Sequence, residues 1–465
     1  MAGPPAQKDG EVMTSSEVEQ VRAAVAAEMP QVISELETLV RIPSFAHSDD
    51  GGAAVAESAQ CVAAMVQAAG LSNARIVQAN AADGTPGGPA VLASQPGPAG
   101  APTVLLYAHH DVQPVADDWS TDPFKPVQRG GRLYGRGSGD DEAGVVTHLA
   151  ALRVLRNQLG VGVALFIEGE EEIGSPTFEA LLAQHQEELR AEVAVVADAE
   201  NWDAETPALT TSLRGLAEVK CTLTVADRQS HSGGFGGPVL DAALLMARLI
   251  ATLHNSQGQV AIEGLMAAGQ SRVEYPEARL REGAGLLDSV RLAGSGSLAD
   301  ALWMKPALAV VGFDAPSSRQ TTNAIQPRAT AVLSLRVPPG VDAAAAARLL
   351  SRHLMAHVEF GAKLVTEVTS IGPGFLADLK GPAGQAAKWA LTTAFGREVV
   401  EMGEGGSIPV ASYLKTAFPG MEVLLTGLID PESRPHAGDE SVCLDTIEKA
   451  IVAEVLLLRR LAGAA

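Results

Sequence analysis

Several short apolar runs along the chain end abruptly in acidic or histidine side chains. Residues 104–108, 163–167 and 193–197 have the composition of short buried strands. The side chains that follow can bind a metal or carry a proton: His109 and Asp111 after the first run, Glu171 and Glu172 after the second, and Asp198 after the third. Open α/β sheets bind ligands at the carboxyl ends of their strands, so we expect these groups to converge on one edge of a sheet.

Asp140 and Asp141 directly precede residues 143–155, where apolar positions recur at helical spacing. Carboxylates at the start of a helix are stabilised by its dipole by about 0.3–1 kcal/mol each, so helix capping alone is one explanation. The other acidic clusters expected at the same edge would repel these two unless a cation lay between them. The sequence therefore favours a metal centre.

The remaining pattern predicts an α/β fold, a mixed sheet flanked by helices. Helices are expected at 16–40, opening with a Ser16–Glu19 capping box and broken or kinked at Pro30, and at 53–70, 383–395 and 444–461. After residue 213 the pattern changes. Alternating strands at 218–225, 330–337 and 363–369, with helices at 240–253 and 343–357, predict an inserted α+β domain of ferredoxin-like type. Within this inserted domain, residues 262–306 are predicted to form an additional helical segment.

These changes give the expected domain boundaries. Residues 1–14 form a flexible leader, 15–213 and 372–465 form a discontinuous metal-binding domain, and 214–371 form the inserted domain. The sequence does not decide whether the protein starts at Met1 or at Met13.

Composition excludes several classes of partner. The formal net charge of −21 and the isoelectric point near 4.9 argue against binding to nucleic acid or to an anionic membrane surface. No apolar run has the length of a membrane span, and the first residues lack the apolar core of a signal peptide. Cys61, Cys221 and Cys443 are far apart and form no Cys-x-x-Cys pair, which favours a reduced, cytoplasmic protein.

Three motifs carry a resemblance to a known family. They are His109-x-Asp111-Val112-Gln113-Pro114, Leu133-Tyr134-Gly135-Arg136-Gly137 followed by Asp140-Asp141, and Glu168-Gly-x-Glu-Glu-x-Gly-Ser175. They resemble the cytosolic non-specific dipeptidase and carnosinase branch of the dinuclear zinc peptidases, a group that also contains aminoacylases and glutamate carboxypeptidases. The likeness extends from about residue 39 to about residue 440.

The resemblance implies a role for each metal-binding residue. Each subunit would hold two divalent metal ions, Zn²⁺ or alternatively Mn²⁺ or Co²⁺, because an oxygen and nitrogen ligand set suits all three. Asp140 would bridge the ions, with His109 and Asp198 on one and Glu172 and His436 on the other. Glu171 would be the base that activates the metal-bridging water. Asp111 would hold the second ring nitrogen of His109 and fix its orientation.

The substrate-binding residues implied by the resemblance come from the insertion and one later loop. They are His231, Asn323, Arg336, Gly406 and Ser407. His231 would act in trans, from the lid of the second subunit of a homodimer, and would stabilise the oxyanion. Arg336 would bind the substrate carboxylate, for which a guanidinium is suited by bidentate pairing.

The predicted function is hydrolysis of the amide bond of a dipeptide or a similarly small substrate that carries a carboxylate. Alternatives within the same chemistry are an N-acyl amino acid amidohydrolase and a carboxypeptidase. A metal-free binding protein is an alternative of another class, which the complete ligand set disfavours. The chain departs from the family pattern at two places. Glu142 stands where the family has a lysine, and a histidine of the family is missing near Lys380. Both departures bear on substrate choice.

Overall fold

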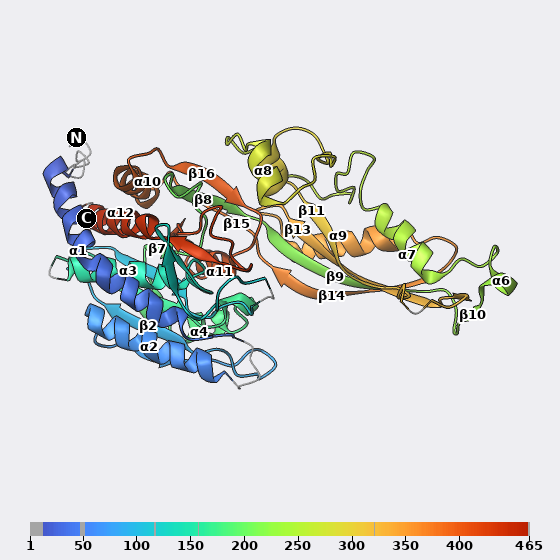
Figure 1. Cartoon of the computed structure of the whole chain (residues 1–465), viewed down its shortest axis with the longest axis horizontal. Helices are drawn as coiled ribbons and strands as arrows, with labels where there is room; N and C mark the ends of the chain where they lie inside the picture. The colour runs from blue at the N-terminus through green and yellow to red at the C-terminus, as the bar shows by residue number, and fades with distance from the viewer. Residues whose placement is uncertain (1–12, 47–51, 116–117, 157, 320, 464–465) are drawn as a thin grey trace, which may run out of the picture. The chain divides into compact units, whose positions relative to one another are not determined.

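A computed structural model of the chain describes residues 13–46, 52–115, 118–156, 158–319 and 321–463 (Figure 1). These residues form two compact units. Unit 1 contains the described residues of Met1–Thr211, Ala377–Met402 and Val410–Ala465, and unit 2 contains those of Ser212–Leu376 and Gly403–Pro409. Of the leader expected at 1–14, all but Met13 and Thr14 lie outside the described residues.

The centre of unit 1 is a mixed sheet. Its strands are, in spatial order, β1 (Arg75–Val77), β2 (Ala90–Gln95), β6 (Gly162–Glu168), β3 (Thr103–His109), β7 (Val193–Val196), β17 (Glu422–Leu425) and β8 (Ala208–Leu213). Strand β3 is parallel to both β6 and β7, so their carboxyl ends meet at one edge. The three predicted apolar runs are therefore confirmed as neighbouring strands.

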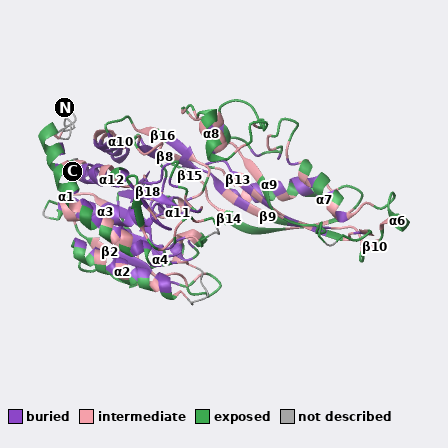
Figure 2. Ribbon diagram, viewed as in Figure 1, coloured by how far each residue is buried: buried purple, intermediate pink, exposed green. Residues whose placement is uncertain are grey.

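Helices cover both faces of this sheet. On one face lie α1 (Ser15–Val40), α2 (Ala53–Ala69), α3 (Glu142–Leu155), α10 (Pro382–Phe395) and α12 (Leu444–Gly463). On the other face Tyr107 and Phe166 stack on each other, and both meet the ring of Phe178 of α4 (Phe178–Gln184) edge-on. Phe178 in turn stacks on Tyr413 of α11 (Pro409–Ala417). A short helix α5 (Gln186–Leu189) follows α4. Between the helices and the sheet lies an aliphatic core, drawn as buried in Figure 2.

Two details of α1 differ from the prediction. Its capping box is formed by Thr14 and Glu17, not by Ser16 and Glu19. The helix continues through Pro30, whose own position is exposed, while Val25, Met29 and Val32 on the buried side pack into the core. Packing of the apolar face outweighs the hydrogen bond that proline removes.

Several short strands of unit 1 carry no clear sequence pattern and were not predicted. A small sheet has the order β18 (Ser441–Cys443), β5 (Arg132–Tyr134) and β4 (Val127–Arg129). Strand β16 (Val400–Glu404) pairs with β8. Strand β5 directly precedes the segment that contains Asp140, and β18 directly follows the segment that contains His436. The pairing of residue 441 with residue 134 therefore brings these two predicted site segments together.

Unit 2 contains the ferredoxin-like arrangement. Its antiparallel sheet has the order β11 (Ala307–Asp314), β13 (Arg328–Val337), β9 (Gly215–Thr224) and β14 (Lys363–Gly372). Helices α7 (Ala242–Ala251) and α9 (Ala343–Ala356) pack on one face through a separate apolar core. Strand β11 was not predicted. The prediction that residues 262–306 are helical is wrong. Within this range only α8 (Glu277–Gly283) and the turn Asp300–Met304 are helical.

Two smaller features complete unit 2. Beyond one end of the sheet, β10 (Ser230–His231) pairs with β12 (Ala324–Ile325), and α6 (Ser232–Phe235) follows β10 (Figure 1). At the other end, β15 (Phe375–Leu376) pairs with Ser212 and Leu213 at the end of β8.

Candidate metal centre

The five predicted metal ligands all belong to unit 1 and come from the polar ends of its elements. His109 is the last residue of β3, Asp198 lies two residues past β7, and Asp140 lies two residues before α3. Glu172 sits in a single 3₁₀ turn, Glu171–Ile173, that follows β6. His436 lies in the loop between β17 and β18.

The structure brings these side chains together in two groups that could each hold an ion. The ligand atoms within each group lie within 4.8 Å of one another, and the groups are His109, Asp141 and Asp198, and Asp140, Glu172 and His436. His109 and Asp198 fall in the first group and Glu172 and His436 in the second; Asp140 is counted in the second group, and Asp141 takes the third place in the first. Sequence reasoning noted Asp141 as half of an acidic pair but gave it no role.

Asp140 lies between the two groups. Its Oδ1 is 3.2 Å from Nε2 of His109, and its Oδ2 is 2.9 Å from Nε2 of His436. His109 Nε2 is also 3.7 Å from Asp198 Oδ1, and His436 Nε2 is 3.2 Å from Glu172 Oε2. One carboxylate that faces a different histidine with each oxygen has the arrangement expected of a ligand shared by two ions.

The pKa shifts of the acidic and histidine side chains reflect an excess of negative charge in the site. Burial raises the pKa of Asp198 to about 6, with the charge of Asp140 contributing, although His109 opposes the shift. Burial and the charge of Asp198 raise the pKa of Glu171 well above its usual value. Hydrogen bonds to Asp140 and Glu172 raise the pKa of His436 to about 10.

Burial, together with the neighbouring negative charges, makes ionisation of Asp198 and Glu171 less favourable, and a divalent cation would offset this penalty. The donor set of imidazole nitrogens and carboxylate oxygens is one that zinc, manganese and cobalt accept. These residues therefore fit a metal centre.

The ring of His109 is held at both nitrogens. Its Nδ1 lies 3.0 Å from the main-chain oxygen of Asp111, which can only accept a hydrogen bond, so Nδ1 carries a proton. Nε2 lies 3.2 Å from Asp140 Oδ1 and is the nitrogen that would bind a metal ion after losing its own proton. The Asp111 carboxylate, which we expected to make this contact, lies farther from Nδ1, at 3.5 Å.

The carboxylate of Asp111 instead holds the turn that carries Glu171 and Glu172. Its two oxygens accept hydrogen bonds from the main-chain N–H groups of Glu171 at 3.1 Å and Glu172 at 3.0 Å. Asp111 is fully buried. One residue thus orients His109 through its main chain and the two glutamates through its side chain.

Gln113 is a further contact that sequence reasoning missed. Its side-chain amide donates to Oε2 of Glu172 at 2.9 Å and to the main-chain oxygen of the same residue at 3.0 Å. The available signal was its place in the His-x-Asp-Val-Gln-Pro motif, but its partner lies 59 residues away and cannot be read from local pattern.

The predicted substrate-binding residues belong to unit 2 and form two groups. Arg336 pairs with Leu216 near the start of β9, on the sheet face opposite the helices. Gly372, the other neighbour of Leu216, approaches the Ser407 hydroxyl, so Ser407 lies at the same end of the sheet, next to Gly406. At the far end, His231 lies on β10, and the main-chain oxygen of Asn323 accepts a hydrogen bond from Ser232.

Arg214 joins Arg336 and was not anticipated. It is 9% exposed and donates to the main-chain oxygens of Gly405 at 3.3 Å and Lys305 at 3.5 Å. Burial and the charge of Arg336 lower the pKa of Arg214 to about 10. Among the described residues, neither guanidinium forms an ion pair with a carboxylate, so this end of the sheet has unbalanced positive charge.

Three other histidines of the chain make packing and hydrogen-bond contacts away from the two ligand groups. The rings of His353 and His357 stack at 4.1 Å, with His353 bonded to Thr252 and His357 bonded to its own helix. His110 is buried, and its ring Nε2 is bonded to the main-chain oxygen of Pro89. The three cysteines are free thiols.

Comparison with known proteins identifies the family. The model of peptidase family M20/M25/M40 matches residues 105–460. The chain belongs to this family. The resemblance inferred from the three motifs is thereby confirmed, and the protein is a hydrolase of the metallopeptidase class.

Relatives within the M20 family include two dipeptidases. The cysteinylglycine-S-conjugate dipeptidase of Corynebacterium striatum is 35% identical over 367 residues, which cover 77% of this chain and 81% of that protein. The human Beta-Ala-His dipeptidase is 27% identical over 365 residues, covering 73% and 71%.

Solved structures of M20 peptidases share the fold. The dipeptidase Dug1p of Saccharomyces cerevisiae superposes with a TM-score of 0.82 at 22% identity and covers 97% of this chain and 99% of its own. Human carnosine dipeptidase 1 superposes with a TM-score of 0.76 at 23% identity, covering 96% and 99%. The predicted fold class is therefore confirmed. No helix among the described residues is long and apolar enough to cross a membrane.

Proposed function

We propose that this M20 peptidase is a dipeptidase that hydrolyses the amide bond of small peptides through a centre of two divalent ions. The observation that carries the proposal is the pair of three-residue ligand groups joined by Asp140, with Glu171 beside them. The names of the relatives support a dipeptide as the substrate.

Five residues would hold the ions: His109, Asp140, Glu172, Asp198 and His436. When bound, such ions polarise the scissile carbonyl group and lower the pKa of water. We propose zinc, with manganese and cobalt as alternatives.

Glu171 would carry the proton. It takes a proton from the attacking water as the C–O bond forms and delivers that proton to the amide nitrogen as the C–N bond breaks, which releases a carboxylate and an amine. Its position is supported by the Asp111 contact to its main chain, which fixes the turn. The Glu171 carboxylate takes part in none of the hydrogen bonds found among the described residues.

Arg336, Gly406 and Ser407 would bind the end of the substrate that carries the free carboxylate. We add Arg214 to this set, because two guanidinium groups without acidic partners favour an anion beside them. Lys380 is another cation that could bind the substrate carboxylate, but it is exposed. The one hydrogen bond described for Lys380 is donated by its main-chain N–H to the side chain of Asp378.

The substrate carboxylate gives a direct test of these arginines. Replacing Arg336 with Met should lower kcat/KM for a dipeptide by about 10- to 100-fold, since a hydrogen bond to a charged group is worth about 1.5–3 kcal/mol. The same change should have little effect on the C-terminal amide of that dipeptide, which lacks the charge. Arg214→Met should follow the same pattern, and an equal loss on both substrates would remove these residues from carboxylate binding.

We further propose that the active form is a homodimer in which His231 and Asn323 act on the substrate of the other subunit. Arg328 and Arg336 lie eight residues apart on strand β13 (Arg328–Val337), a separation of about 26 Å along a strand. His231 lies beyond the Arg328 end (Figure 1), whereas a dipeptide is only about 7 Å long. One copy of unit 2 could not contact the same dipeptide with both His231 and Arg336.

Mixing two inactive variants tests this arrangement. Dimers of His231→Ala subunits and dimers of Glu171→Gln subunits should each be inactive. After exchange of subunits, a mixed dimer contains one site with both an intact Glu171 and an intact His231, so about a quarter of the sites should regain activity at equal mixing if exchange is random. Proof of exchange without recovered turnover would contradict the action of His231 in trans.

The reaction itself is tested with a panel of dipeptides and N-acetyl amino acids. Faster turnover of dipeptides supports the proposal, and a preference for N-acetyl amino acids would assign the chain to the aminoacylase type instead. Three free cysteines support a reducing compartment, and we propose the cytoplasm.

A further inference from the structure

The loop that carries His436 has an unusual main-chain conformation. Arg434, His436 and Asp439 are not glycine, yet their φ angles are +54°, +60° and +57°. Side chains disfavour this left-handed region, so contacts with the rest of the protein must hold the loop. At its tip, Asp439 accepts hydrogen bonds from Ser120, and Gly438 donates to Asp118 at 3.3 Å. These two contacts are exposed or half-buried.

The buried end of the loop is Glu440, which is fully excluded from solvent. One oxygen, Oε1, accepts hydrogen bonds from the main-chain N–H groups of Gly139 at 3.0 Å and Asp140 at 3.2 Å. The main-chain oxygen of Glu440 accepts a further hydrogen bond from Gly135 at 3.0 Å. Glu440 therefore joins the segment that ends in Asp140 to the loop that carries His436.

The other carboxylate oxygen of Glu440 is paired with Arg136. The distance from Arg136 Nη1 to Glu440 Oε2 is 2.5 Å, and the two side chains are 1% and 0% exposed. The Arg136 guanidinium also lies over the ring of Trp119, at 5.5 Å from its centre. A buried ion pair resists distortion because either charge left without its partner is strongly disfavoured.

We propose that Glu440, held by Arg136, is a positioning residue of the metal centre that fixes Asp140 relative to His436. The inference depends on the proposed metal centre, and it concerns how two ligands more than 290 residues apart in sequence are kept in register. Without the Glu440 contacts, the main chain at Asp140 and the strained loop at His436 would relax separately. The ion of the group Asp140, Glu172 and His436 should be affected most.

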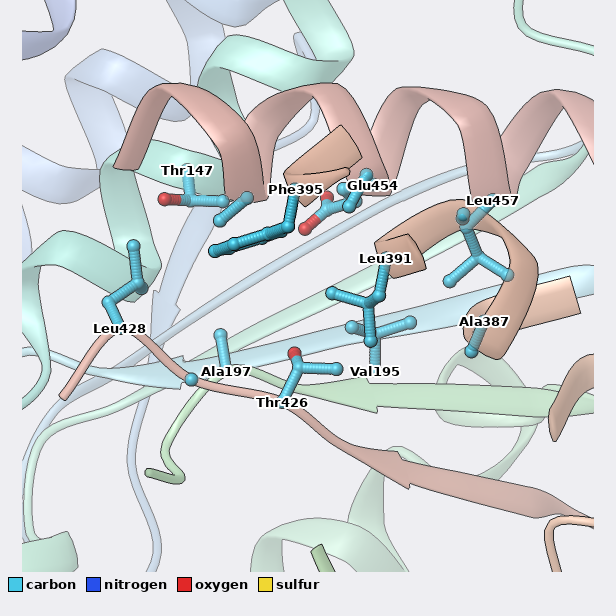
Figure 3. A pocket seen from close by; sticks show the side chains of 14 residues that line it. Thr147, Val195, Ala197, Ala387, Leu391, Phe395, Thr426, Leu428, Glu454 and Leu457 are labelled. Atoms are coloured by element: carbon cyan, nitrogen blue, oxygen red, sulfur yellow. The ribbon is translucent and has the colours of Figure 1, made fainter. Parts of the chain in front are cut away.

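Glu454 provides a matched control. It is also a buried glutamate paired with a cation, since its Oε2 is 2.8 Å from Nδ1 of His148 and its side chain is 6% exposed. Figure 3 shows it among Leu391, Phe395 and Leu457 at an apolar pocket. None of its described hydrogen bonds reaches a proposed metal ligand. Glu454→Gln therefore measures the cost of neutralising a buried glutamate elsewhere in the same unit.

The experiment measures metal binding and not turnover. Full-length wild-type protein, Glu440→Gln and Glu454→Gln are stripped with a chelator and titrated with Co²⁺, with calorimetry and visible absorption as readouts and thermal unfolding recorded in parallel. In Glu440→Gln we expect one of the two Co²⁺-binding steps, that of the group Asp140, Glu172 and His436, to lose at least tenfold in affinity and the Co²⁺ spectrum to change. In Glu454→Gln we expect a lower Tm with wild-type affinity and spectrum.

Co²⁺ affinity of Glu440→Gln within twofold of wild type would overturn the proposal, because the contact would then serve stability alone. If Glu440→Gln does not fold, Arg136→Lys tests the same contact while keeping the charge. It should show a smaller loss of affinity in the same direction, and wild-type affinity would again overturn the proposal.

Wild-type protein that binds no ions would instead disprove the metal centre, and wild-type protein that binds ions without cleaving dipeptides would disprove only the proposed reaction.

Discussion

Replacing Glu171 with Gln should lower kcat for dipeptide hydrolysis by about 10²- to 10⁴-fold, the usual contribution of a general acid or base. Glutamine has the same shape but cannot take a proton from water or return one to the amine. Metal content should be unchanged, because Glu172 and not Glu171 belongs to a ligand group and the main-chain contacts with Asp111 remain. Steady-state kinetics together with elemental analysis of the purified protein check both parts.

Glu170→Gln is the control for this change. Glu170 belongs to the same acidic run, but its oxygens accept hydrogen bonds from Thr177 and from the main chain of Gly88, so its role is to hold the loop. We expect a lower Tm and a much smaller loss of kcat than for Glu171→Gln. If the Glu171 variant kept wild-type turnover, the proton would have to be carried by another group.

Replacing Asp140 with Ala should remove metal from the whole centre. Asp140 faces His109 with one oxygen and His436 with the other, so its loss deprives both ligand groups of the same carboxylate. We expect affinity for both ions to fall by more than about 100-fold, the upper range for residues that only support a ligand, and dipeptide turnover to disappear with it. Elemental analysis after dialysis against metal-free buffer gives the number of ions per chain.

Asp83→Ala is a suitable comparison, because Asp83 is exposed and its described side-chain hydrogen bond is with the main-chain N–H of Thr85, two residues on. It should keep the wild-type metal content. Retention of two ions per chain by the Asp140 variant would show that the two groups do not share this ligand, and Asp141 would become the candidate for the first group.

The parts of the fold that the sequence predicted are those determined by local pattern. The apolar runs of β3, β6 and β7 are buried on both faces, and each ends where polar residues begin, so both their existence and the position of the site could be read directly. Helix α3 follows an acidic pair and has a regular apolar spacing, and it was predicted to within one residue. The ligands His109, Asp140, Glu172, Asp198 and His436 were then supplied by resemblance.

What the sequence did not reveal depends on contacts between distant segments. Strand β11 has no strict alternation, since it lies at an edge of its sheet and is partly exposed on both faces. Residues 262–306 contain apolar residues at spacings that imitate a helix, but glycines and prolines interrupt them and few of their side chains are buried. The roles of Gln113 and Glu440, and the approach of Arg214 to Arg336, arise only after folding brings together residues that are 59 to 301 positions apart.

The order of strands in unit 1 has a consequence for how the protein is made. Strand β17 lies between β7 and β8, so the sheet cannot be completed until residue 425 has left the ribosome. His436 and Glu440 emerge later still. A nascent chain that has already exposed His109, Asp140 and Asp198 will display these proposed ligands beside an open strand edge, and the proposed ligand set is complete only after the last segment has been synthesised.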